Sequence, residues 1–94
     1  MKINGILWLE DIVEKLFLKH KVDKNEVREI MKSQPLFLFV EKGHQKGENL
    51  YAAFGQTETG RYLAVYFIHK KNSEALILSA RDMTQPERRK YEQR

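Results

Sequence analysis

Two arginines occupy matching ends of a strand pair in the last third of the chain. Residues 61–69 and 74–81 are rich in β-branched and aromatic residues, and a short polar break separates them. This pattern is typical of an antiparallel hairpin. Arg61 opens the first segment and Arg81 closes the second. Because the start of one antiparallel strand lies beside the end of the next, we expect both guanidinium groups at the same edge of the sheet.

This arginine pair has two interpretations. A planar guanidinium can hold phosphate oxygens through two parallel hydrogen bonds, so two of them on a rigid β element predict a phosphate site. Strand-end arginines are also commonly solvated, which is the alternative.

A short helix is expected after the hairpin. Thr84 is a suitable N-cap, Glu87 is the reciprocal acid of a capping box, and Pro86 fits the first turn. The run Arg88-Arg89-Lys90 and the remaining residues to Arg94 are charged and only weakly amphipathic. The sequence therefore predicts a peripheral helix with a solvated basic face.

The composition bounds the class of protein. The chain has 94 residues, 41% of them hydrophobic and 11% aromatic, which predicts one globular domain over residues 1–94. A formal net charge of +4 fits an anionic partner without requiring one. The absence of cysteine excludes disulfides, thiolate metal sites and a cysteine nucleophile. No segment has the length of apolar residues that a signal peptide or bilayer span needs, so we expect a soluble cytoplasmic protein.

No metal or other cofactor is expected. The three histidines lack the i, i+4 spacing and the carboxylate partner that indicate a metal site. A Gly-rich phosphate loop, a serine nucleophile pattern and a dinucleotide fingerprint are also missing from the sequence.

Two helices are expected before the hairpin, after an apolar edge strand around residues 3–8. The first helix begins near Glu10 and has a buried stripe at helical spacing, made of Ile12, Val13, Leu16 and Phe17. The second begins at Asp23, with Glu26 completing a capping box and with Val22 and Val27 as a hydrophobic staple. It should end just before Pro35.

The remaining segments predict strands. Residues 36–40 form a continuous apolar run, as expected of a strand covered on both faces. Residues 50–54 form the next strand, and glycines bound the turn from 55 to 60. The predicted fold class is α+β: an antiparallel sheet packed against a pair of N-terminal helices, with a C-terminal helix.

Several motifs spread over nearly the whole chain resemble one known family. They are Trp8 before the first helix; Lys19-His20 followed by Val22; Gly55-Gln56-Thr57; Gly60-Arg61-Tyr62-Leu63 and Val65; and Leu78-Ser79-Ala80-Arg81 followed by Glu87 and Tyr91. In these motifs the chain is similar to the BrnT family of toxins from bacterial type II toxin–antitoxin systems, which share a RelE-like fold. The Ser-Ala-Arg element with a glutamate and a tyrosine at that distance is the more specific mark.

The resemblance implies a function. It implies an RNA-cleaving toxin that inhibits translation and is neutralised by a BrnA-like antitoxin with a DNA-binding domain, in a possible dimer or heterotetramer. The chain also departs from the family pattern, with Leu50 and Leu76 where members usually carry arginine and Lys21 where a glycine is common. These changes leave open weakened cleavage, altered substrate choice or an inactive relative.

The expected chemistry is RNA cleavage without a metal. Such an enzyme must deprotonate a ribose 2′-OH, protonate the leaving 5′ oxygen and stabilise charge on phosphorus. We assign His20 to proton transfer, because an imidazole titrates near neutral pH, and Arg61 and Arg81 to the phosphate. The residues expected to contact RNA or to support the arginines are Lys19, Lys21, Glu87 and Tyr91.

Two alternatives stay open. His20 has a second interpretation, as a residue favoured at a helix C-terminus only by the dipole. The whole chain also has a second interpretation: it is a catalytically weak or inactive protein of the toxin fold that binds an antitoxin or acts as a co-repressor.

Overall fold

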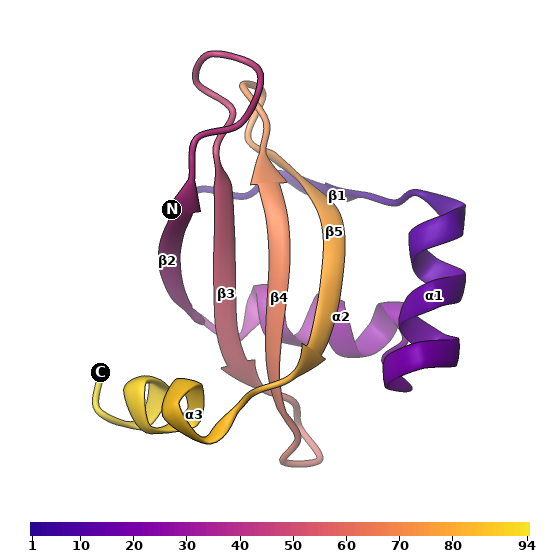
Figure 1. Ribbon diagram of the computed structural model, residues 1–94, viewed down its shortest axis with the longest axis vertical. Coiled ribbons are helices and arrows are strands. Elements are labelled where there is room, and N and C mark those ends of the chain that lie inside the picture. Colours follow the sequence, from indigo (N-terminus) through magenta and orange to yellow (C-terminus); the bar gives the residue numbers. More distant parts are fainter.

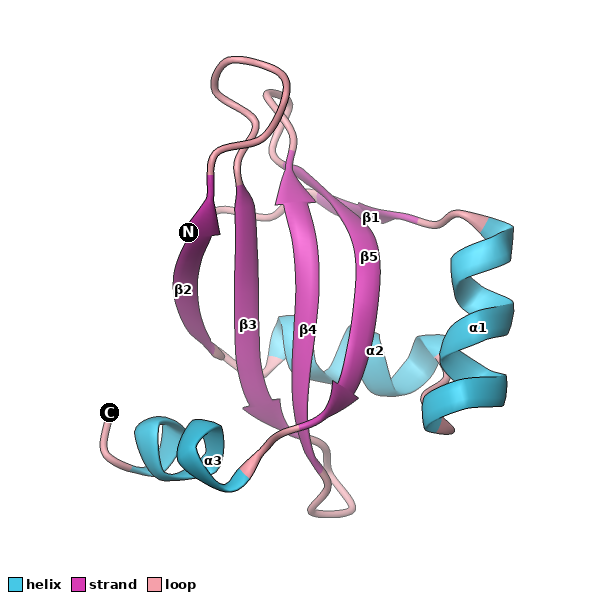
Figure 2. Ribbon diagram, viewed as in Figure 1, coloured by secondary structure: helices cyan, strands magenta, loops and turns pink.

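A computed structural model describes residues 1–94 and shows a five-stranded sheet with three helices around it (Figures 1 and 2). In chain order the elements are β1 (Gly5–Leu7), α1 (Glu10–His20), α2 (Lys24–Lys32), β2 (Leu36–Glu41), β3 (Leu50–Gln56), β4 (Tyr62–His69), β5 (Glu74–Asp82) and α3 (Gln85–Glu92). The predicted α+β class, with two N-terminal helices and one C-terminal helix, is confirmed. No helix has both the length and the apolar character needed to cross a membrane.

The sheet is mixed, which corrects the expectation of a purely antiparallel one. Its strand order is β1-β5-β4-β3-β2, and the pairs from β2 to β5 are antiparallel as predicted. The short strand β1 pairs with β5 in parallel. Parallel neighbours need a long connection, and this pair has one, because residues 8–73 separate the two strands.

Helices α1 and α2 cover one face of the sheet, which we call the helix-covered face (Figure 1). Its core residues are buried side chains of both helices, of the connection between them and of the three long central strands: Leu16, Val22, Val27, Ile30, Ala53, Leu63, Val65, Phe67, Ala75, Ile77 and Ala80. Burying this apolar surface is the main source of stability, at roughly 25 cal/mol per Å².

The caps of the two later helices form as predicted. The Asp23 carboxylate accepts a hydrogen bond from the Glu26 backbone N–H, and the Glu26 side chain accepts one from the backbone N–H of Asp23. Thr84 and Glu87 make the same reciprocal pair at α3. Each cap satisfies backbone donors that a helix start leaves without partners.

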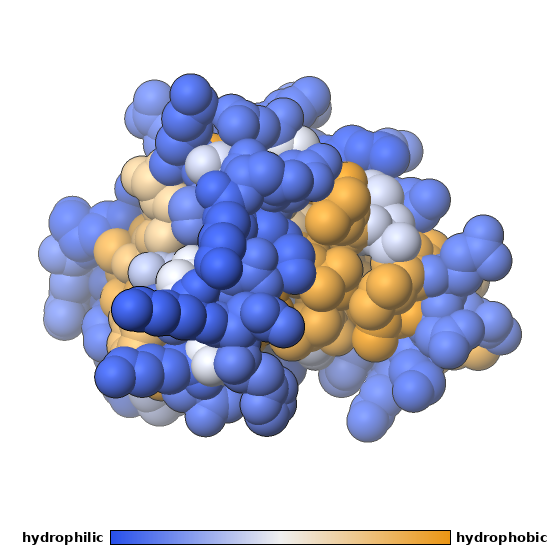
Figure 3. Space-filling model, turned by 90° about the horizontal axis from the view of Figure 1, so that it is seen from above, coloured by the Kyte–Doolittle hydropathy of each residue, from blue (hydrophilic) through white to orange (hydrophobic).

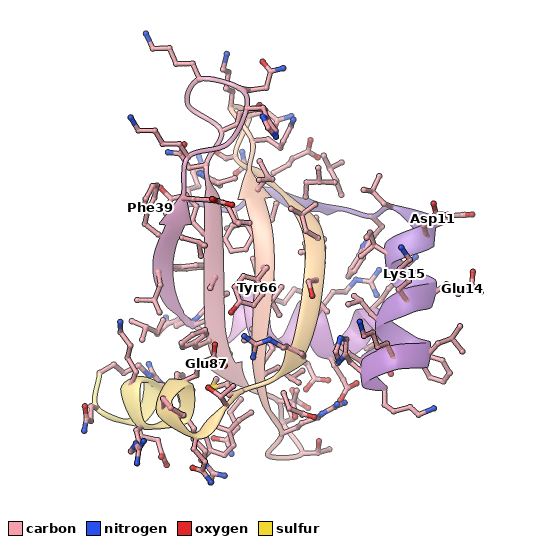
Figure 4. The ribbon with its side chains drawn as sticks, viewed as in Figure 1. Asp11, Glu14, Lys15, Phe39, Tyr66 and Glu87 are labelled. Atoms are coloured by element: carbon pink, nitrogen blue, oxygen red, sulfur yellow. The ribbon has the colours of Figure 1, made fainter.

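Two predictions of burial are wrong. Phe17 was expected in the stripe of α1 but is 55% exposed, because α1 packs mainly on strand β5 and buries only a narrow face there. Strand β2 was expected to be covered on both faces, yet Phe39 is 58% exposed. The reason is that β2 forms the free edge of the sheet, where Phe39 lies in Figure 4.

The second face of the sheet, which we call the open face, carries only α3, at the end where β5 finishes (Figure 1). There Tyr91 packs with Ala52, Phe54 and Ala64 in a smaller core. Beyond α3 no helix lies over this face. On its central strands, Leu50, Tyr66 and Ile68 are only partly buried.

Candidate functional site

Arg81 and Glu87 form a bidentate ion pair on the open face. Arg81 Nη1 donates to Glu87 Oε1 at 2.7 Å, and Arg81 Nη2 donates to Glu87 Oε2 at 2.9 Å. Arg81 is the last residue but one of β5, and Glu87 lies in the first turn of α3, where the capping box fixes it. Of the two residues expected to support an arginine, Tyr91 and Glu87, it is Glu87 that contacts Arg81.

Tyr66 on β4 is the third member of this cluster, which we call the Arg81 cluster. Its hydroxyl accepts a hydrogen bond from Arg81 Nη2 at 2.8 Å and donates one to Glu87 Oε2 at 3.3 Å. The guanidinium also lies 5.3 Å from the centre of the Tyr66 ring. Figure 4 shows Tyr66 in the middle of the sheet, above Glu87. One cation, one carboxylate and one phenol thus meet on an accessible β surface.

The cluster fixes the charge state of each group. The hydrogen bonds from Arg81 lower the pKa of Glu87 to about 2, so this carboxylate is ionised at neutral pH. The same carboxylate raises the pKa of the Arg81 guanidinium. Partial burial raises the pKa of Tyr66, which keeps the phenol protonated and able to donate.

Tyr91 lies away from this cluster, although the sequence motif joins it to Arg81. Its ring is 9% exposed and packs edge-on against Tyr62, and its hydroxyl accepts a hydrogen bond from Arg94 Nη2 at 3.0 Å. Tyr91 therefore anchors α3 in the smaller core.

Arg61 is enclosed by groups of the protein on the other side of the sheet. Its Nη1 and Nη2 donate to the carbonyl oxygens of Lys21 and His20, both at 2.6 Å. Its Nε donates to Asp82 Oδ1 at 2.8 Å, and Glu26 Oε2 lies 3.2 Å from Nη1. These acceptors use the whole donor set of the guanidinium, so Arg61 joins the end of α1, the start of α2 and the end of β5.

The two arginines share one residue, Asp82. Arg61 binds the carboxylate of Asp82, whereas Arg81 Nη1 donates to its backbone carbonyl at 3.1 Å. Both arginines therefore lie at the same end of the sheet, as predicted. Successive residues of a strand point to opposite faces, so the guanidinium groups lie on opposite faces, and the prediction of one joint clamp is wrong.

The basic residues at the end of α1 lie on the helix-covered side. Lys19 and Lys21 are exposed, and His20 is half-buried with a side chain that forms no hydrogen bond. Of His20, only the backbone carbonyl takes part, by accepting a hydrogen bond from Arg61. The structure therefore links His20 to Arg81 through Arg61 and Asp82 and not through side-chain contact.

Tyr66 and Asp82 were missed in the sequence. Tyr66 pairs with Ser79, and Ala64 pairs with Arg81, so Tyr66 is a diagonal neighbour of Arg81 on the same face. The alternation of faces along a strand narrows the candidates, but only the register between β4 and β5 identifies Tyr66. Asp82 carried the signal of an acid directly after a strand-end arginine.

No group of three or more His, Asp or Glu side chains that could hold a metal ion occurs in the chain. Buried side-chain polar atoms all have hydrogen-bond partners. The chemistry available at the Arg81 cluster is anion binding by a guanidinium and proton donation by a phenol.

The fold and the Arg81 cluster define a small α+β protein with a guanidinium, a carboxylate and a phenol together on an open sheet face. Residues 8–87 match the family described as "Ribonuclease toxin, BrnT, of type II toxin-antitoxin system", and the chain belongs to that family. The resemblance stated from the motifs is thereby confirmed, and it implies an RNA substrate and an antitoxin partner. A comparison with curated proteins found no match.

Proposed function

We propose that this chain is a metal-independent endoribonuclease toxin. It cleaves RNA in the cytoplasm, inhibits translation and is neutralised by a BrnA-like antitoxin that carries a DNA-binding domain. The observation that carries the proposal is the Arg81 cluster, an oriented cation and phenol on an open face, in a chain of a ribonuclease toxin family.

Arg81 is the proposed phosphate ligand. Its side chain is 32% exposed, and Glu87 holds the guanidinium in one orientation. Nη1 and Nη2 are used by protein acceptors, whereas Nε–H has no acceptor in the chain and is free for a phosphate oxygen. A preorganised donor of this kind stabilises the charge that builds up on phosphorus in the transition state.

Tyr66 is the proposed proton donor. The Tyr66 phenol is protonated, lies 2.8 Å from Arg81 and can donate to the leaving 5′ oxygen. His20, flanked by Lys19 and Lys21, is the sequence-based candidate for removing the proton of the 2′-OH, but it lies on the helix-covered side and does not face the phosphate that Arg81 would bind. The two lysines are proposed to hold the RNA strand on that side. Arg61 and Glu87 act as positioning residues, through the ends of the helices and through Arg81 respectively.

A second candidate function follows from the state of the two arginines. Arg61 has its donors occupied by protein acceptors, and Arg81 is paired with a carboxylate. Both observations favour a catalytically weak toxin-fold protein that serves as an antitoxin-binding module or co-repressor.

Expression in bacteria that lack the antitoxin gene separates the two candidates. A ribonuclease toxin arrests growth and degrades total RNA after induction, and Arg81→Ala abolishes both effects. The matched control is Arg89→Ala, which removes an exposed arginine of α3 that has no ion pair. Normal growth with intact RNA after induction of the wild-type protein would exclude the ribonuclease toxin and support the antitoxin-binding module.

A further inference from the structure

The open face has an apolar hollow at the end remote from α3. The hollow measures about 370 Å³, and its floor is formed by Leu50, Ile68, Leu76 and Leu78. Leu50 pairs with Ile68, and Ile68 pairs with Leu76, so these three form one row across β3, β4 and β5. All four side chains are half-buried in the isolated chain. A contiguous apolar patch on a sheet face is typical of a protein interaction surface.

The loops that form the rim of the hollow carry a small excess of positive charge. They are the loop over residues 42–49 and the turn after β4, which lie at the same end of the sheet (Figure 1), and hydrophilic residues cover the middle of the view from above (Figure 3). Residues 41–48 together with 70 and 71 contain four lysines and two glutamates. Glu48 is already used, because it accepts hydrogen bonds from Lys70 Nζ at 2.8 Å and from the Lys71 backbone N–H at 3.2 Å. Glu48 and Lys70 therefore neutralise each other. Among the remaining charges of these loops, Lys42, Lys46 and Lys71 outnumber Glu41, and of these Lys42 and Glu41 line the hollow itself.

We propose that this hollow receives a segment of the antitoxin that presents apolar side chains flanked by acidic residues. This inference rests on the proposed function, because it assigns a surface to the antitoxin of that toxin. The charges argue for the acidic flanks, since a positive rim attracts and orients a negative partner. An apolar centre with a polar rim is also the usual anatomy of a protein interface.

RNA fits the hollow less well. Nucleic acid binds through phosphate contacts and through stacking of bases on aromatic rings. The floor offers only aliphatic side chains, and Glu48, the buried acid beside it, has its partners within the protein. A polar small molecule is disfavoured for the same reason, because such ligands need convergent free polar groups.

The position of the hollow explains how binding could block the Arg81 cluster. Leu76 and Arg81 lie on the same strand, five residues apart, or roughly 16 Å at about 3.3 Å per residue. A helix of about 11 residues, at 1.5 Å per residue, covers that length. An antitoxin segment anchored in the hollow would therefore reach over Tyr66 and exclude RNA.

The test measures binding of the antitoxin, taken as the protein encoded beside this gene, to purified full-length variants. Leu76→Glu places a charge in the floor and should weaken the Kd at least tenfold. The matched control is Leu18→Glu, a leucine of α1 that is 63% exposed, which should change the Kd less than twofold. Thermal unfolding of each variant shows that it is folded. Equal Kd values for Leu76→Glu and the wild type would overturn the inference.

If Leu76→Glu does not fold, the test uses a variant of the rim instead. Lys42→Glu changes an exposed side chain and should weaken binding several-fold, most strongly at low salt. An unchanged Kd would overturn the inference. If Lys42→Glu weakens binding of a model RNA and leaves the antitoxin Kd unchanged, the hollow belongs to RNA. Absence of any complex with the wild-type protein would instead remove the proposed function and this inference with it.

Discussion

Arg81 and Glu87 come from different elements and meet in two parallel hydrogen bonds of 2.7 and 2.9 Å. The six-residue interval that joins them contains the end of β5 and the cap of α3. Glu87 Oε1 also accepts from the Thr84 backbone N–H at 2.8 Å, so one carboxylate orients the arginine and starts the helix. The site and the local fold therefore depend on the same side chain.

Lowering the pH should break the Arg81–Glu87 ion pair. Glu87 has a pKa lowered from 4.5 to about 2, so its contribution to stability is complete above pH 4.5 and is lost as the pH falls toward 2. We expect a loss of about 1–2 kcal/mol over that window, reduced from the full linkage value by solvent screening. Urea unfolding of the wild type and Glu87→Gln at pH 7 and pH 3 measures this difference.

Glu87→Gln should lower stability at pH 7 and flatten its pH dependence, since glutamine keeps the cap without the charge. The control is Glu92→Gln, which affects an exposed pair with Arg88 at 3.9 Å. Parallel pH profiles for the wild type and Glu87→Gln would contradict the assignment.

Arg61 is predicted to matter for folding as well as for activity. Arg61→Ala leaves two backbone carbonyls at the end of α1 and two carboxylates without their cation. We expect a loss of about 2–3 kcal/mol in the free energy of unfolding. Lysine should restore less than half, because it lacks the planar fork. Arg89→Ala should change stability by less than about 0.5 kcal/mol. An Arg61→Ala protein as stable as the wild type would show that Arg61 has no structural role.

Replacing Lys21 by glycine should make the folded protein more stable. It follows α1 with φ of 56° and ψ of 36°, a left-handed conformation that costs a residue with a Cβ about 1 kcal/mol. Lys21→Gly should therefore raise the free energy of unfolding by up to about 1 kcal/mol, because its backbone contacts stay. Lys15→Gly, in the exposed middle of α1, should lower it by about 1 kcal/mol. Chemical denaturation measures both, and a destabilised Lys21→Gly would contradict this account of the helix end.

The Asp23 cap gives a local test of the fold. Its carboxylate accepts the Glu26 backbone N–H at 2.9 Å, so Asp23→Ala should cost roughly 0.5–2 kcal/mol. Asp23→Asn retains an acceptor and should cost less. Equal midpoints of urea unfolding for Asp23→Ala and the wild type would show that the cap contributes nothing.

The sequence allowed local features to be predicted well and distant ones poorly. The caps at Asp23 and Thr84 were found because their partners lie three residues away. The parallel pairing of β1 and the exposure of Phe39 were missed, because both depend on which strand lies at the edge of the sheet. No local pattern records that order.

The candidate site shows the same division. The pairing of Glu87 with an arginine could be expected, because both lie within one short segment. The separation of Arg61 from Arg81 could not, since it depends on the alternation of faces at Arg81 and Asp82 and on the carbonyls of α1. Tyr66 required the register between β4 and β5.

Cleavage of a model RNA by the purified protein, with EDTA present, tests the central claim most directly. The account predicts cleavage by the wild type and by Arg89→Ala. Arg81→Ala should lose about a hundredfold or more in rate, the usual effect of removing one preorganised donor. Arg81→Lys should also be impaired, because it keeps the charge without the planar fork. An inert wild-type protein, or an Arg81→Ala variant that is folded and cleaves at the wild-type rate, would contradict the assignment of ribonuclease activity to the Arg81 cluster.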